Sequence, residues 1–132
     1  MATYIPAKKN TAYITYVGLV SKANASILQA NPTLANGDVK LAIDDAFPVQ
    51  IEAGGGALPV VDADFTKRVK VTLTSAQMNG DNISIIFSDA AGDEWCDLIV
   101  NIQTAANQID DIETDLDAVL SKLNLITYYV YN

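Results

Sequence analysis

The chain has 132 residues, with 16 Asp and Glu against 8 Lys and Arg, no histidine and one cysteine. A net charge of -8 opposes binding to nucleic-acid phosphates or anionic lipid, which both recruit Lys and Arg patches. Without histidine there are no Ser-His or Cys-His dyads and no usual catalytic zinc ligands. We therefore expect a single soluble domain with a short appendage, and no enzyme, metal, cofactor, nucleic-acid or membrane partner.

Residues 1–10 are predicted to form an N-terminal arm without a secretion signal. Lys8 and Lys9 stand out in this acidic protein, and we expect them to meet an acidic surface of a neighbouring protein. Cys96 has no cysteine partner in the chain, which is typical of folding in a reducing cytoplasm.

Residues 11–103 alternate apolar and polar side chains between turns rich in Gly, Asn, Asp and Pro, which predicts six or seven antiparallel strands in a β-sandwich. A weaker strand is expected at 25–30 and a single turn at 75–79. The predicted inward positions are Tyr13, Thr15, Val17, Leu19, Val39, Leu41, Ile43, Val49, Ile51, Val69, Val71, Leu73, Ile83, Ile85, Phe87, Cys96, Leu98, Val100 and Ile102.

Two residues near the end of this region have alternative interpretations. Cys96 alternates with apolar residues and has acidic neighbours, so we predict a core thiol and not a nucleophile. Trp95 falls on the opposite face, where it is either an interface aromatic or is packed beneath a loop. The carboxylate pairs of the region match surface turns better than calcium loops, and Gly54, Gly55 and Gly56 predict a flexible loop.

At Thr104, a suitable helix N-cap, the period changes to alternating steps of four and three residues. This heptad pattern predicts a helix over residues 104–126 with an apolar stripe between acidic flanks. The stripe is Ala105, Ile109, Ile112, Leu116, Val119, Leu123 and Ile126.

The stripe can cover its own sandwich or copies of itself. The strict 3.5-residue period favours self-association, because a helix on a sheet needs only a broad apolar face. Ile109 and Ile112 place isoleucine at both core positions of one heptad, which favours three or more strands over two. We predict a parallel homotrimeric coiled coil.

Residues 127–132 form an aromatic tail with three of the six tyrosines of the chain, Tyr128, Tyr129 and Tyr131. Tyrosine buries a large area while keeping a polar tip, which suits interfaces. We predict that the tail docks on another protein; the alternative is a strand that folds back on the trimer or the domain.

Three phrases are distinctive: ANPTLANGDVKL at 30–41, LTSAQMN at 73–79 and DLD at 115–117. Over residues 10 to 120 the chain resembles a module of tailed-bacteriophage virion proteins, found in tail, fibre, baseplate and head-appendage proteins. That module usually has Glu at the position of Gln77. The resemblance implies an immunoglobulin-like β-sandwich followed by a trimerising helix.

The function that this resemblance implies is structural. We expect a homotrimeric fibre or adaptor protein, assembled in the host cytoplasm and located in the virion, that attaches to capsid, neck or tail proteins. One alternative is a capsid decoration protein, either cement or head fibre. The other is a receptor- or carbohydrate-binding module, with Trp95 and tyrosines stacking on sugars.

Overall fold

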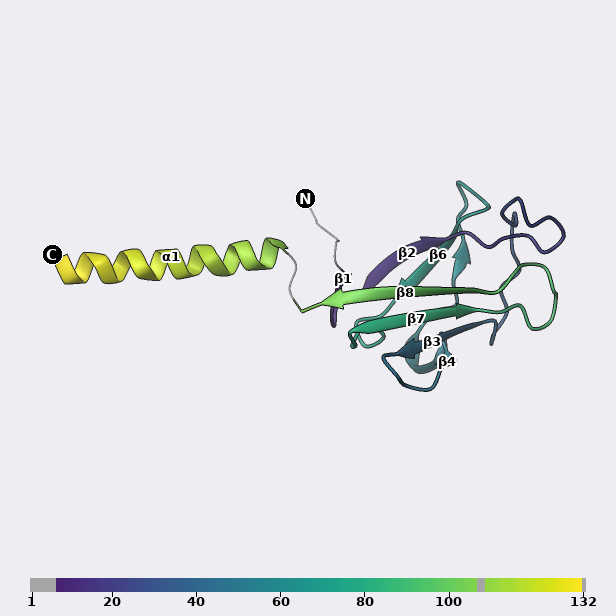
Figure 1. Ribbon diagram of the computed structural model, residues 1–132, viewed down its shortest axis with the longest axis horizontal. Helices are drawn as coiled ribbons and strands as arrows, with labels where there is room; N and C mark the ends of the chain where they lie inside the picture. The colour runs from purple at the N-terminus through teal and green to yellow at the C-terminus, as the bar shows by residue number, and fades with distance from the viewer. Residues whose placement is uncertain (1–6, 107–108, 132) are drawn as a thin grey trace.

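The computed structural model describes residues 7–106 and 109–131, without the side chains of residues 109 and 110. This part of the chain folds into two sheets and one C-terminal helix, α1 (Figure 1). The strands are β1 (Ala7–Lys8), β2 (Tyr13–Val17), β3 (Val39–Ile43), β4 (Val49–Gln50), β5 (Val60–Val61), β6 (Val69–Leu73), β7 (Asn82–Phe87) and β8 (Leu98–Ala105). The helix α1 is Ile109–Tyr131, and a short 3-10 turn, η1, is Ala53–Gly55.

The larger sheet has the order β1-β8-β7-β3-β4, and the smaller one has the order β2-β6-β5. Every strand pair is antiparallel except β1 with β8, where Ala7 lies opposite Thr104 and Lys8 opposite Ala105 in parallel register. The expected mainly β fold with a terminal helix is confirmed. The predicted arm is wrong for residues 7–10, because Ala7 is buried in the sheet and Asn10 donates to the Met78 carbonyl. Residues 1–6 of that arm lie outside the described residues.

The two sheets share one hydrophobic core. The alternation predicted for β3, β6 and β7 is confirmed, because their inward side chains are buried or nearly so. Polar side chains on the outer side of these strands remain in water, as expected for sheets with one wet face. This burial gives the two-sheet domain, residues 7–105, a complete core of its own.

Two local predictions, for Val49 and for residues 25–30, are wrong. Val49 is exposed, because β4 is a two-residue edge strand whose ladder ends before Ile51 turns inward. Residues 25–30 form only an isolated bridge between Leu28 and Val20. The three glycines lie in and beside the η1 turn, with Gly54 at φ 66° and Gly55 at φ 90°, values that glycine adopts at little cost.

Trp95 and Cys96 exchange the places that strand alternation assigns to them. Trp95 is buried and packs edge-on against Phe87, with 6.4 Å between ring centroids, whereas Cys96 is partly exposed. The reason is that β8 begins only at Leu98, so residues 95 and 96 lie in a loop where period two does not apply. Packing of Trp95 beneath a loop, the second interpretation above, is therefore confirmed.

The predicted turn at 75–79 is present and is held by Thr74 and Gln77. The Thr74 amide donates to Gln77 Oε1 at 2.9 Å, and the Gln77 amide donates to Thr74 Oγ1 at 3.2 Å. This reciprocal pair has the geometry of a capping box. Gln77 Nε2 also donates to the Ile51 carbonyl at 2.8 Å, which a glutamate could not do. Gln77 therefore ties the turn to the chain after β4.

Candidate oligomerisation helix

The start of α1 lies later than the sequence predicts. β8 continues through Thr104 and Ala105, and the Thr104 amide donates to the Asp81 carbonyl at 3.0 Å while its hydroxyl contacts the Gly80 carbonyl. The predicted N-cap and the first stripe position are therefore strand residues. The parallel partner β1, which the alternation pattern does not reveal, extends the ladder through Ala105 and delays the helix.

The predicted tail is part of the same helix, since α1 continues to Tyr131. The alternative of a strand that folds back is therefore wrong, and the predicted helix end at residue 126 lies five residues too early. Thr127, although β-branched, satisfies its hydroxyl by donating to the Leu123 carbonyl at 3.1 Å, one turn earlier. Val130 stands four residues after Ile126 and extends the heptad stripe to the last turn. Tyr128 and Tyr129 pack edge-on, with 5.6 Å between ring centroids.

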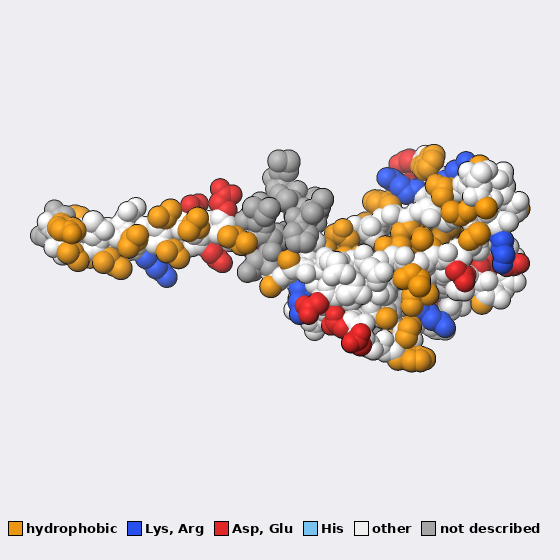
Figure 2. Space-filling view, viewed as in Figure 1, with side chains coloured by type: hydrophobic (Ala, Val, Ile, Leu, Met, Phe, Trp, Pro, Cys, Tyr) orange, Lys and Arg blue, Asp and Glu red, His pale blue; other side chains and the backbone are white. Residues whose placement is uncertain are grey.

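Figure 1 shows α1 projecting from the two-sheet domain, and Figure 2 shows apolar side chains along its length. Between 54% and 59% of each described stripe residue from Ile112 to Ile126 is exposed, and 67% of Val130. Burying the remainder of one such side chain is worth on the order of 1 kcal/mol. The stripe is an apolar surface without a covering layer among the described residues.

The two halves of α1 differ in charge. The first half has acidic residues beside the stripe, at positions 110, 111, 113, 115 and 117. Negative charge near the N-terminus stabilises a helix, because it interacts with the positive end of the helix dipole. Residues 123–131 contain no charged side chain. Leu120, Leu125 and the three tyrosines are exposed outside the stripe, so the second half is apolar on most sides. Only the first half is amphipathic in the strict sense.

The expected docking lysines already have partners within the chain. Lys8 Nζ lies 2.7 Å from Asp111 Oδ2 at the start of α1, and Lys9 Nζ lies 3.0 Å from Asp81 Oδ1. Ion pairs exposed to water contribute about 0–1 kcal/mol, so the Lys8–Asp111 pair does not fix the helix firmly to the domain. Docking by Lys8, Lys9 and the three tyrosines stays a prediction.

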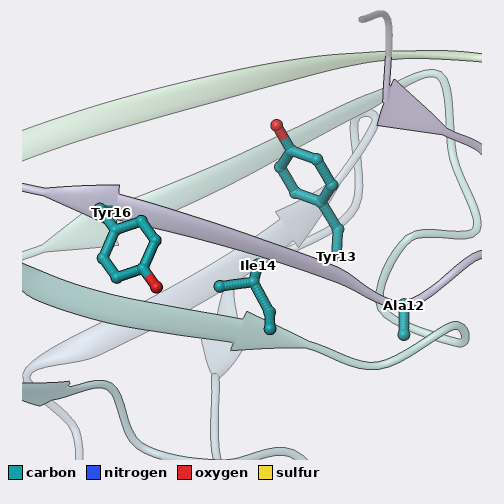
Figure 3. Close-up of a pocket in the computed structure, with 4 residues that line it drawn as sticks. All are labelled: Ala12, Tyr13, Ile14 and Tyr16. Atoms are coloured by element: carbon teal, nitrogen blue, oxygen red, sulfur yellow. The ribbon is translucent and has the colours of Figure 1, made fainter. Parts of the chain in front are cut away.

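A second exposed apolar surface lies on β2. Ala12, Tyr13, Ile14 and Tyr16 line an open groove beside this strand (Figure 3). The Arg68 guanidinium lies over the Tyr16 ring at 4.0 Å from its centroid. Trp95 does not contribute to this groove and is 1% exposed, so the expectation that it stacks on a sugar is wrong.

Groups with shifted pKa values lie in exposed turns and do not converge on a cleft. A hydrogen bond and the charge of Asp93 raise the pKa of Lys22. The amide of Asp64, followed by Arg68, lowers the pKa of Asp62. The amides of Glu94 and Gly92 lower the pKa of Asp89. Among the described residues, no three His, Cys, Asp or Glu side chains are grouped to hold a metal ion.

Comparison with protein-family models, curated proteins and solved structures finds no match to this chain. Within the described part of the chain, α1 lacks the combination of length and hydrophobicity that a bilayer crossing requires.

Proposed function

We propose that the chain is a non-enzymatic structural component of a bacteriophage virion, a homotrimeric protein of fibre or adaptor type. The observation that carries the proposal is the stripe of α1, which is exposed from Ile112 to Val130 beside a domain that has a hydrophobic core of its own. Copies of the same helix have the matching surface, and a closed ring of three copies covers every stripe equally.

The residues of the stripe support a parallel three-stranded coiled coil. Position d has Ile112, Val119 and Ile126, where a two-stranded coil prefers leucine, and position a has Leu116 and Leu123. Leucine at a with isoleucine at d shifts the preference to three or more strands. The parallel arrangement places all two-sheet domains at one end of the stalk.

Sheet order supports an immunoglobulin-like sandwich for the two-sheet domain. The order β2-β6-β5 facing β8-β7-β3 corresponds to strands B-E-D facing G-F-C of immunoglobulin domains. The parallel contact of β1 with β8 joins the first strand to the last. A rigid sandwich on a three-fold stalk is suited to an assembly part present in many copies. The resemblance of the phrases at 30–41 and 73–79 to modules of phage virion proteins supports a virion as that assembly.

The decisive experiment is light scattering coupled to size exclusion. We expect wild-type chains to reach at least three times the chain mass of 14.1 kDa. Leu116→Asp with Leu123→Asp, which puts charges into the seam, is expected to abolish the three-fold association. Ser121→Asp is the matched control, since this residue is exposed outside the stripe. Wild-type and seam-variant chains of equal mass would contradict the coiled coil.

The virion location has its own test. Mass spectrometry of purified particles, from a phage whose genome encodes the chain, is expected to detect it in a copy number divisible by three. Its absence from particles, with the protein present in the infected cell, would contradict a structural role. A copy number proportional to capsid area would instead indicate decoration of the head.

A further inference from the structure

Four strands form the edges of the two sheets within the described residues: β1, β4, β5 and β2. The first three have only two residues each, and each directly follows a proline, Pro6, Pro48 or Pro59. Shortness and proline are common ways to prevent an edge from pairing with another chain. Three of the four edge strands are thus protected against added strands, although β1 covers only Thr104 and Ala105 of β8 and leaves residues 98–103 paired with β7 alone.

The fourth edge, β2, lacks these protections. Its sequence, Tyr-Ile-Thr-Tyr-Val, has five residues of high β propensity, without charge, proline or glycine. Within the described residues β2 pairs with β6 on one side only. An uncharged edge strand of this length presents free backbone donors and acceptors to any strand that approaches.

The surroundings of β2 are open and apolar. Ile14 and Tyr16 are 49% and 45% exposed on its outer side, and Figure 3 shows Tyr13 on the other side of the strand. The groove of about 470 Å³ described above lies against these residues. The stacked Arg68 guanidinium holds the Tyr16 ring at the surface.

We propose that β2 pairs with β2 of a second copy, in antiparallel register about a two-fold axis at Thr15. This register places Ile14 of one copy opposite Tyr16 of the other, an aromatic and β-branched pair that stabilises cross-strand contacts. On the inner side Tyr13 lies opposite Val17. The two smaller sheets then form one six-stranded sheet, β5-β6-β2 continued by β2-β6-β5.

Charge supports a second copy as the occupant. Each chain has a net charge of -8, so close approach of two copies is favourable only where no carboxylates meet. In the proposed register none of the ten residues of the two β2 strands is charged. The strand is therefore self-complementary both in its side chains and in its lack of repulsion.

The role of the β2–β2 contact in a larger assembly rests on the proposed function, because it presupposes the trimer. A two-fold contact cannot join the members of one three-fold ring, so it joins different trimers. Each trimer offers three β2 edges, and their pairing links trimers into larger assemblies. The stalk thus sets the three-fold axis and β2 sets the two-fold axis.

Light scattering on five full-length proteins tests this contact. We expect wild-type chains to exceed the trimer mass and reach six chains or more as concentration rises. Ile14→Lys, which places a cation against Tyr16 and Arg68 of the other copy, is expected to return the mass to three chains. Phe47→Lys is the control, because Phe47 is also exposed but lies outside the strands of either sheet.

The seam variant Leu116→Asp with Leu123→Asp separates the two proposals. It is expected to leave pairs of chains held by β2 alone, and adding Ile14→Lys should yield single chains. A wild-type mass that stays at three chains, with single chains for the seam variant, would overturn the β2 contact and leave the trimer intact. A seam variant with the wild-type mass would overturn the trimer instead.

Cross-linking locates the axis. In a Cys96→Ser background, Thr15→Cys is expected to form covalent pairs of chains on oxidation, because directly opposed residues of antiparallel strands have Cα atoms about 4.5–5.5 Å apart. Ser84→Cys is the control, because β7 is paired at this position with β3 on one side and with β8 on the other. Equal cross-linking at both positions, or Ile14→Lys abolishing attachment to a different virion protein without changing the mass, would overturn the proposal.

Discussion

The two-sheet domain buries leucine and isoleucine side chains in its core, whereas α1 leaves side chains of the same types exposed. Leu73, Ile83 and Ile85 in the domain are 0% exposed, whereas Ile112 and Leu116 in the helix are 56% and 58% exposed. Apolar surface in water costs about 25 cal/mol per Å² relative to burial. The domain buries these side chains within a single chain, whereas the helix leaves its apolar side chains in contact with water.

This difference in burial indicates that α1, and not the two-sheet domain, depends on a partner for its stability. The 23-residue helix α1 leaves its apolar stripe unpacked among the described residues, and most helical stability in proteins comes from packing of such a face. The domain has its contacts regardless of concentration. We expect its stability to be intramolecular and that of α1 to follow mass action.

The largest expected effect comes from truncating one buried ring. Phe87→Ala removes a fully buried side chain that contacts Trp95, and we expect the free energy of unfolding of the domain to fall by about 3–5 kcal/mol. Chemical denaturation followed by tryptophan fluorescence measures it. Phe47→Ala, at an 88% exposed position, should change stability by less than about 0.5 kcal/mol.

The matching truncation in the helix sharpens the comparison. Leu123→Ala should leave the denaturation of the domain unchanged and lower the helix melting temperature, measured by circular dichroism at 222 nm, by an amount that depends on protein concentration. A loss of domain stability in dilute, monomeric protein would show that α1 packs on its own domain, which would break the distinction between the two regions.

The second effect concerns a buried carboxylate. Asp38 is 4% exposed and accepts from the Ala35 amide at 2.9 Å and from the Ala90 amide at 3.4 Å. Asp38→Ala leaves these donors unpaired, and we expect a loss of about 1–3 kcal/mol in the free energy of unfolding. Denaturation of Asp45→Ala, at an exposed turn position, is the control. Equal losses in both variants would contradict a role for these hydrogen bonds.

A smaller effect depends on pH. The amides of Glu94 and Gly92 hold the pKa of Asp89 below its ordinary value of 3.8, so the folded state favours the carboxylate. Its contribution to stability is complete above pH 3.8 and is lost as the pH falls through the lowered pKa. The difference in melting temperature between wild type and Asp89→Asn should therefore be largest near neutral pH and shrink in acid. A difference that grows in acid would contradict this assignment.

The smallest effect lies at the junction of the two regions. Lys8→Ala breaks the ion pair with Asp111, and we expect a change of less than about 1 kcal/mol in the stability of the domain, measured by denaturation. Lys122→Ala, a charge removed in the middle of α1, is the control. A large loss for Lys8→Ala alone would show that the junction, and not the stripe, positions the helix.

Much of the domain was accessible from the sequence. The alternation in Val69, Val71 and Leu73, and in Ile83, Ile85 and Phe87, predicts the inward faces of β6 and β7 because a strand repeats every two residues. Similarly, the four-three spacing predicts α1 and its stripe. Both patterns depend only on the backbone geometry of a single strand or helix, so they can be recognised from the sequence alone.

Other features needed the tertiary structure. The two-residue strands β1 and β5 are too short to display a period, and β1 exists because β8 offers it a parallel edge. The same contact moved Thr104 and Ala105 from the predicted helix into a strand. Trp95 is buried by Phe87, a residue eight positions earlier on another element, which alternation along one strand cannot reveal.

The sequence by itself determined the class of the molecule: an acidic, mainly β domain followed by a heptad helix, since composition and period are properties of the chain. Tertiary structure alone decided where strand gives way to helix, which aromatic enters the core, and that β2 is paired on one side only within the described residues. These depend on contacts between residues distant in sequence, because strand pairing and burial are decided by what lies alongside each segment in space.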